Sequence, residues 1–194
     1  GERLACRLVV ATLLDRGIHA ELVTLESIVD ELDEEIMRPP SLAYEASNYL
    51  EQAFYDRLST VLAERILKCE GVPVVTGYFG NVPGSLLSQV GRGYTDLCAA
   101  LCAVGLKASE LQIWKEVDGV FTADPRKVPT ARLVPAITPE EAAELTYYGS
   151  EVIHPFTMEQ AIKKSVPIRI KNVDNPTGCG CLLYTSDAAD ERSS

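Results

Sequence analysis

Residues 72–126 contain two β-rich runs, each followed by a polar loop, with one helical run between them. The first run, VPVVTGYF at 72–79, is short, β-branched and bounded by glycines, which predicts a buried strand. A helix at 94–106 and a second strand at 111–114 follow. Strand, helix and strand in this order are typical of a parallel sheet in an α/β fold. Because ligands of such sheets bind beyond the carboxyl ends of the strands, we expect both loops to line one crevice.

The alternation of helices and strands extends through most of the chain. Further helices are predicted at residues 3–14, 44–69, 138–148 and 156–164, and further strands at 18–24 and 166–173. The apolar positions of the first helix fit a largely buried element. Thr138 is expected to cap its helix, and His154, beside Pro155, is interpreted as a packed or capping group rather than a catalyst.

The charge of the chain excludes nucleic acid as a partner. The 194 residues carry a formal net charge of −10, whereas nucleic acids are bound through clustered lysines and arginines. No apolar run approaches the length of about 18 residues that a transmembrane helix needs. Six cysteines without a CxxC pair predict no disulfides, and the acidic segment at 26–40, which lacks the glycine of a calcium loop, is interpreted as a solvated surface segment rather than a metal site. An acidic chain that binds an anion needs a few placed cations, and Arg92 and Arg126 are the candidates.

The loop that follows the first strand suits an anion. Its glycines precede a helix, so that backbone N–H groups could approach a phosphate or carboxylate at the positive end of that helix. A turn and an ordinary helix start also explain Gly91-Arg92-Gly93, and capping alone explains Thr95 and Asp96. Arg92 is different, because a cation at a helix N-terminus opposes the helix dipole unless an anion lies between them.

Three motifs carry a resemblance to a known family. GRGYTD at 91–96, KEVDGVFTADPR at 115–126 and GSEVIHPFTMEQA at 149–161, taken together, resemble the aspartate kinases of the amino acid kinase family, most closely those of fungi. The resemblance implies an α/β fold, a three-layer αβα sandwich with a mainly parallel sheet that is incomplete at its N-terminus. Residues 1–184, which begin with the family-like GERLAC, would form the C-terminal two-thirds of the catalytic domain. Residues 185–194 would be a disordered or foreign tail.

The resemblance implies transfer of the γ-phosphoryl group of ATP, with Mg²⁺, to the side-chain carboxylate of L-aspartate. The product, 4-phospho-L-aspartate, leads to threonine, methionine and, in some organisms, lysine. A carboxylate with a pKa of about 4 is already ionised at neutral pH, so this reaction needs no general base. It needs alignment of two anions and neutralisation of the charge on the moving group. The family also implies a cytoplasmic homo-oligomer.

Single residues receive roles through the same resemblance. Asp96 corresponds to the family's active-site aspartate, which organises catalytic lysines by its charge. Glu2 corresponds to the glutamate that holds the ammonium group of the substrate. The other residues expected to bind or border the amino acid are Phe79, Arg92, Gly93 and Thr95. The residues expected on the nucleotide side are Lys115, Glu116, Phe121, Asp124 and Arg126.

Three departures from the family pattern bear on these roles. The KFGG-type motif that supplies a catalytic lysine and the regulatory ACT domains do not occur in this sequence, so the chain alone is expected to be inactive. Glu151 stands where bacterial relatives carry a lysine, and it receives no phosphate role. Tyr94 stands where many bacterial members have glycine, which would narrow the pocket. Two alternatives stay open: another acceptor, as in glutamate 5-kinase or uridylate kinase, and a non-catalytic module that binds no nucleotide.

Overall fold

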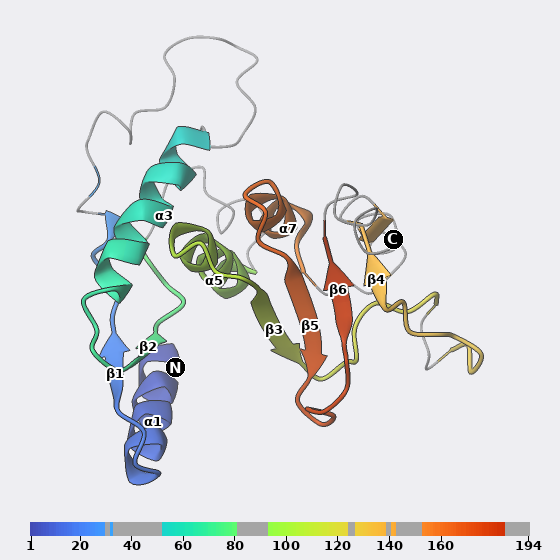
Figure 1. Cartoon of the computed structure of the whole chain (residues 1–194), viewed down its shortest axis with the longest axis horizontal. Coiled ribbons are helices and arrows are strands. Elements are labelled where there is room, and N and C mark those ends of the chain that lie inside the picture. The colour runs from blue at the N-terminus through green and yellow to red at the C-terminus, as the bar shows by residue number, and fades with distance from the viewer. Residues whose placement is uncertain are drawn as a thin grey trace. The chain divides into compact units, whose positions relative to one another are not determined.

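Figure 1 shows the computed structural model of the chain, in which helices and strands alternate as predicted. The structure describes residues 1–29, 32, 52–80, 93–123, 127–138, 141–142 and 153–184. The chain divides into two compact units, Gly1–Leu106 and Lys107–Ser194. Within the described ranges, no helix combines the length and the hydropathy that crossing a membrane requires.

The described part of the first unit contains three helices and two strands. Their order is α1 (Glu2–Asp15), β1 (Ala20–Val23), α3 (Gln52–Ile66), β2 (Val72–Val75) and α5 (Tyr94–Gly105). Strands β1 and β2 pair in parallel, with Ala20 opposite Val72. Parallel neighbours need a long crossover, and α3 lies in that crossover, which confirms the sheet type expected from the alternation. The first residues predicted for this helix, 44–51, lie outside the described residues.

Helices α3 and α5 pack against each other and bury the core of the first unit (Figure 1). Helix α3 buries one face, as its apolar spacing predicts, and the buried residues are Phe54, Tyr55, Leu58, Ser59, Val61, Leu62, Ala63 and Ile66. Where α5 ends, a Cβ on Gly105 would overlap the backbone carbonyl of Ser59. The absence of a side chain at Gly105 therefore lets the two helix backbones approach each other closely.

Two expectations about burial in the first unit are wrong. Helix α1 is not buried, since Leu4 and Leu8 are 63% and 61% exposed. It packs against β1 and β2, but these contacts leave both leucines largely exposed. Strand β2 is not fully buried either, because Val72 is 46% exposed and β1 is the strand paired with β2 among the described residues. The apolar residues of α1 and β2 predicted that both elements are buried, but the described residues leave them partly exposed.

The second unit is built on a sheet with the strand order β3-β5-β6-β4 (Figure 1). Its strands are β3 (Leu111–Lys115), β4 (Ala136–Ile137), β5 (Ile168–Asn172) and β6 (Cys181–Leu183). The pairs β3–β5 and β4–β6 are parallel, whereas β5 and β6 are antiparallel. The sheet is thus mainly parallel, as predicted, but β4 and β6 were not predicted. Strands of two and three residues are too short to show a period in the sequence.

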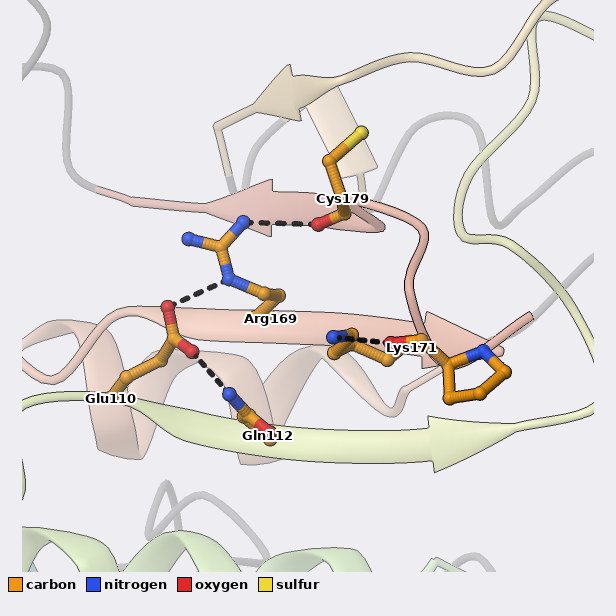
Figure 2. Close-up of polar contacts among 6 residues, drawn as sticks. Glu110, Gln112, Arg169, Lys171 and Cys179 are labelled. Atoms are coloured by element: carbon orange, nitrogen blue, oxygen red, sulfur yellow. Dashed lines mark hydrogen bonds and ion pairs between the residues drawn. The ribbon is translucent and has the colours of Figure 1, made fainter. Parts of the chain in front are cut away.

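One face of this sheet carries a polar network, shown in Figure 2. Arg169 donates a 2.8 Å hydrogen bond from Nε to Glu110 Oε2, and its Nη1 donates to the carbonyl of Cys179 at 3.1 Å. Gln112 donates to the other oxygen of Glu110 at 2.8 Å. Further along β5, Lys171 lies over the ring of Trp114, with Nζ 4.8 Å from the ring centroid. These contacts join β3 to β5 and connect β5 to the segment that leads into β6.

Helix α7 (Pro155–Ile162) confirms the interpretation of His154 as a capping group. The Nδ1 atom of His154 accepts a 3.2 Å hydrogen bond from the backbone N–H of Phe156, and Pro155 occupies the first helical position. A second predicted cap is also present. The backbone N–H of Thr138 donates to the Glu141 carboxylate at 3.0 Å, and the N–H of Glu141 donates to the Thr138 hydroxyl at 3.3 Å.

Candidate functional site

Three segments that are distant in the sequence converge in the first unit. The Thr95 hydroxyl, at the start of α5, donates a 2.8 Å hydrogen bond to Oε1 of Glu2, at the start of α1. Gly77, at the exit of β2, lies against both side chains. A Cβ on Gly77 would be 2.5 Å from Cγ2 of Thr95 and 2.8 Å from Oε1 of Glu2, so a side chain there would displace one of them. A carboxylate, a hydroxyl and the half-buried backbone of Gly77 thus meet beside two helix N-termini.

The N-terminus of α5 explains why the Thr95 hydroxyl is available. The N-cap of this helix is Gly93, which has a φ of 80°, and α5 has no side-chain capping hydrogen bond. The sequence left open that Thr95 caps this helix. The structure shows that its hydroxyl does not cap α5 but donates to Glu2. Asp96 lies half-buried in the same first turn, where a carboxylate interacts favourably with the helix dipole.

An aromatic cluster lies behind this convergence. Phe79 is 1% exposed and stacks on Tyr94, with ring centroids 4.5 Å apart and an interplanar angle of 26°. The Tyr94 hydroxyl donates a 2.5 Å hydrogen bond to the carbonyl of Gly80. Burial, with a smaller contribution from Tyr78, raises the pKa of Tyr94 well above its usual range, so the phenol stays protonated and can donate. Phe79, expected to border the amino acid, thus lies inside the core of the unit.

Free thiols contact the backbone at the end of β2. The Cys6 thiol lies 3.6 Å from the carbonyl of Val75, and the Cys98 thiol lies 3.9 Å from the carbonyl of Thr76. Burial and the nearby Glu2 carboxylate raise the pKa of Cys6. All six cysteines are free, and these two act as small packed side chains with weak S–H donors.

The second unit contains the predicted nucleotide-side residues at the exit of β3. Lys115 is the last residue of that strand, and its carbonyl accepts a 2.9 Å hydrogen bond from the N–H of Val173. Glu116 follows and is exposed, whereas Phe121 is half-buried and forms an isolated β-bridge with Leu133. Backbone hydrogen bonds also join residues 120–122 to residues 132–134. Backbone hydrogen bonds therefore hold both the last residue of β3 and the segment around Phe121.

The predicted site residues thus fall into two groups. The first unit contains Glu2, Phe79, Gly93, Thr95 and Asp96, and the second contains Lys115, Glu116 and Phe121. Three predicted residues, Arg92, Asp124 and Arg126, lie outside the described residues. That both groups line one crevice stays a prediction.

Two residues that lie beside the first group, Gly77 and Tyr94, received no substrate role from the sequence. Gly77 is one, and the only signal for it was a glycine at the end of a β-rich run. Tyr94 is the other, and the signals for it were its place between Gly93 and Thr95 and its expected effect on the width of the pocket.

Comparison with known proteins places the chain in a family. The model of the amino acid kinase family matches residues 1–172. The aspartokinase of Schizosaccharomyces pombe is 60% identical over 185 residues, which cover 95% of this chain and 33% of that protein. The aspartokinase of Candida albicans is 56% identical over 192 residues, with coverages of 95% and 33%. The chain therefore spans about a third of the length of these relatives.

A solved structure supports the same assignment. Aspartokinase III of E. coli, in complex with aspartate and ADP, is 26% identical to this chain, with a TM-score of 0.67. The match covers 96% of this chain and 40% of that one. The predicted α/β fold with mainly parallel sheets is confirmed by this similarity and by the family match. The chain belongs to the amino acid kinase family.

Proposed function

We propose that the complete protein carrying this chain is an ATP-dependent aspartate kinase. The relatives with 60% and 56% identity are both aspartokinases, and the identity extends over nearly the whole chain. The observation that carries the proposal is the convergence of Glu2, Gly77 and Thr95 beside the N-terminus of α5. This arrangement offers a carboxylate for an ammonium group and helix N–H groups for an anion, which an amino acid substrate requires.

In this proposal, Glu2 binds the ammonium group of aspartate, while Gly93, Thr95 and Arg92 bind its carboxylates. An oxygen of the ionised side-chain carboxylate attacks the γ-phosphorus of ATP, and the bond from that phosphorus to the β–γ bridging oxygen breaks, which releases ADP. No proton has to be removed from the acceptor. Asp96 is the catalytic aspartate, positioned by the first turn of α5.

The nucleotide side of the proposal rests on the exit of β3. Lys115 and Glu116 would lie near the adenosine with Phe121, while Asp124 and Arg126 would lie near the phosphates. Within the described residues, no group of three or more His, Cys, Asp or Glu side chains is arranged to hold a metal ion. Mg²⁺ would be held mainly by the phosphates of ATP with one or two protein carboxylates, and it would neutralise charge on the transferred phosphoryl group.

The remaining assignments are part of the same proposal. Residues 1–184 are a large part of the catalytic domain, and residues 185–194 do not belong to it. The protein is a cytoplasmic homo-oligomer. The chain by itself lacks activity, because the proposal places a catalytic lysine in a motif that this sequence does not contain.

The test is ATP-dependent formation of an acyl hydroxamate, measured with aspartate, glutamate and UMP as separate acceptors. For UMP, which forms no hydroxamate, release of ADP replaces that readout. The complete protein should turn over aspartate with a kcat/KM at least about a hundredfold above that for glutamate, because the acceptor must fit between fixed polar groups. A preference for glutamate or UMP would replace the proposed acceptor, and robust turnover by the chain alone would refute its inactivity. Absence of any Mg·ATP binding to the complete protein would favour a non-catalytic module.

A further inference from the structure

We propose that Tyr94 is a positioning residue for the acceptor amino acid, acting by holding the exit of β2 against the start of α5. The inference rests on the proposed aspartate kinase function and deepens it. Tyr94 is the first residue of α5, and it lies between two residues with proposed substrate roles, Gly93 and Thr95. It does not itself touch a reacting group in this proposal.

The ring of Tyr94 fixes the direction in which the chain leaves β2. It stacks on Phe79 at 4.5 Å and lies 5.7 Å from the ring of Tyr78, so that two successive residues of the strand exit contact one side chain of α5. Tyr94 is only 7% exposed and Phe79 only 1% exposed. Such closely packed rings transmit a displacement of one segment to the other, because protein interiors contain few voids that could absorb it.

The hydroxyl of Tyr94 fixes the peptide at the end of this exit. It donates its hydrogen bond to the carbonyl of Gly80, a buried residue with a φ of 122°. A Cβ on Gly80 would lie 2.7 Å from Cγ2 of Val29, so the backbone here is held from a second side as well. Without the hydroxyl, the buried carbonyl of Gly80 would lose this donor, and the peptide would have to move to find another.

Any such movement reaches the proposed acceptor site through Gly77. This glycine lies three residues before Gly80, and its backbone is so near Thr95 and Glu2 that an added Cβ would overlap their side chains. Tyr94 of α5 thus contacts the strand exit at Phe79 and Gly80, and the same strand exit lies against Thr95 of α5 at Gly77. These contacts include proposed acceptor residues, whereas the proposed nucleotide residues lie at the exit of β3. Loss of the hydroxyl should therefore weaken the binding of aspartate and leave the binding of ATP unchanged.

The experiment uses Tyr94→Phe in the complete protein, which removes the hydroxyl and keeps the ring. We expect the KM for aspartate to rise about tenfold, with the KM for ATP changing less than about twofold, because the loss of one buried hydrogen bond has this size. The matched control is Tyr184→Phe, which removes the hydroxyl of a half-buried tyrosine without a proposed role and should leave both KM values unchanged. A uniform rise of both KM values in Tyr94→Phe, or no change in either, would overturn the inference.

A second variant separates positioning from a loss of stability. Replacing Tyr94 with 4-aminophenylalanine keeps the ring and restores an N–H donor, so it should bring the KM for aspartate back to within about threefold of the wild type. Circular dichroism melts are measured first, and all assays are run well below the melting temperatures. Failure of the amino variant to restore aspartate binding would contradict the role of the donor. A wild-type protein without aspartate-dependent turnover would refute the proposed function and this inference together.

Discussion

The Thr95 hydroxyl and the Glu2 carboxylate lie 2.8 Å apart although 93 positions separate them in the chain. Each belongs to the first two residues of its own helix, Glu2 in α1 and Thr95 in α5. Both residues are exposed, so their hydrogen bond contributes little to stability, and its value lies in fixing the direction of a carboxylate. This relationship can be tested separately from the fold.

Thr95→Val removes the hydroxyl and keeps the shape of the side chain. We expect the KM for aspartate to rise about tenfold or more, because Glu2 loses its orienting donor and the substrate loses a polar neighbour. The free energy of unfolding should change by less than about 1 kcal/mol, since the bond is exposed. Steady-state kinetics and urea unfolding measure the two effects. Thr60→Val is the control, because Thr60 is an exposed threonine of α3 whose hydroxyl contacts only the backbone of Asp56 among the described residues, and its kinetics should match the wild type.

Gly77→Ala should impair the acceptor site with little loss of stability. The backbone of Gly77 does not have a positive φ, so alanine is permitted there, but its Cβ would displace the ends of the Thr95 and Glu2 side chains. We expect a rise of about tenfold in the KM for aspartate and a loss of less than about 1 kcal/mol in unfolding free energy.

Gly17→Ala provides the opposite pattern as a control for Gly77→Ala. Gly17 has a φ of 75° with open space around it, so alanine there should cost about 1–2 kcal/mol of stability while both KM values stay unchanged. Equal effects of the two substitutions on aspartate binding would show that Gly77 has no special role.

Gly105→Ala tests the approach of α5 to α3. An alanine in a helix normally gains up to about 1 kcal/mol over glycine. Here the added Cβ would overlap the backbone of Ser59, so we expect a net destabilisation of about 1–3 kcal/mol. Chemical unfolding followed by circular dichroism measures the sign. A stabilised variant would mean that the two helices do not approach as closely as described.

Glu110 should make the stability of the chain depend on pH. Burial raises the pKa of its carboxyl, but hydrogen bonds from Gln112 and Arg169 outweigh this effect and leave the pKa below its usual value. A carboxyl with a lowered pKa in the folded state contributes stability above its unfolded pKa and loses it as the pH falls through the folded pKa. Glu110→Gln should therefore be less stable than the wild type by about 1 kcal/mol at pH 7, the order expected for a charge-assisted pair near the surface.

Urea unfolding at a series of pH values measures this difference for Glu110→Gln. It should shrink as the pH falls below about 4, since the wild-type carboxyl then becomes protonated. Glu64→Gln, at an exposed position of α3, is the control and should show no such trend. A difference that stays constant from neutral to acidic pH would contradict the assigned ion pair with Arg169.

Much of the fold follows from local patterns. Helix α3 buries the face that its apolar spacing predicted. The β-branched run between glycines at 72–79 correctly predicted a strand, which is β2. The prediction that α1 is buried was wrong, because apolar residues such as Leu4 and Leu8 show only what a helix could bury. Whether another element covers them depends on the tertiary structure.

The sequence by itself determined the order of helices and strands, the α/β class and the motifs of an amino acid kinase, because helix and strand periods and turn residues are local properties. It also left two readings for Thr95, a cap or a ligand-binding residue. Only the tertiary structure decided that Gly93 caps α5 and that the Thr95 hydroxyl instead meets Glu2 beside Gly77. The same holds for the contact of Tyr94 with Gly80, 14 positions away. Such contacts depend on how separate elements pack, and the spacing of residues along the chain does not encode that geometry.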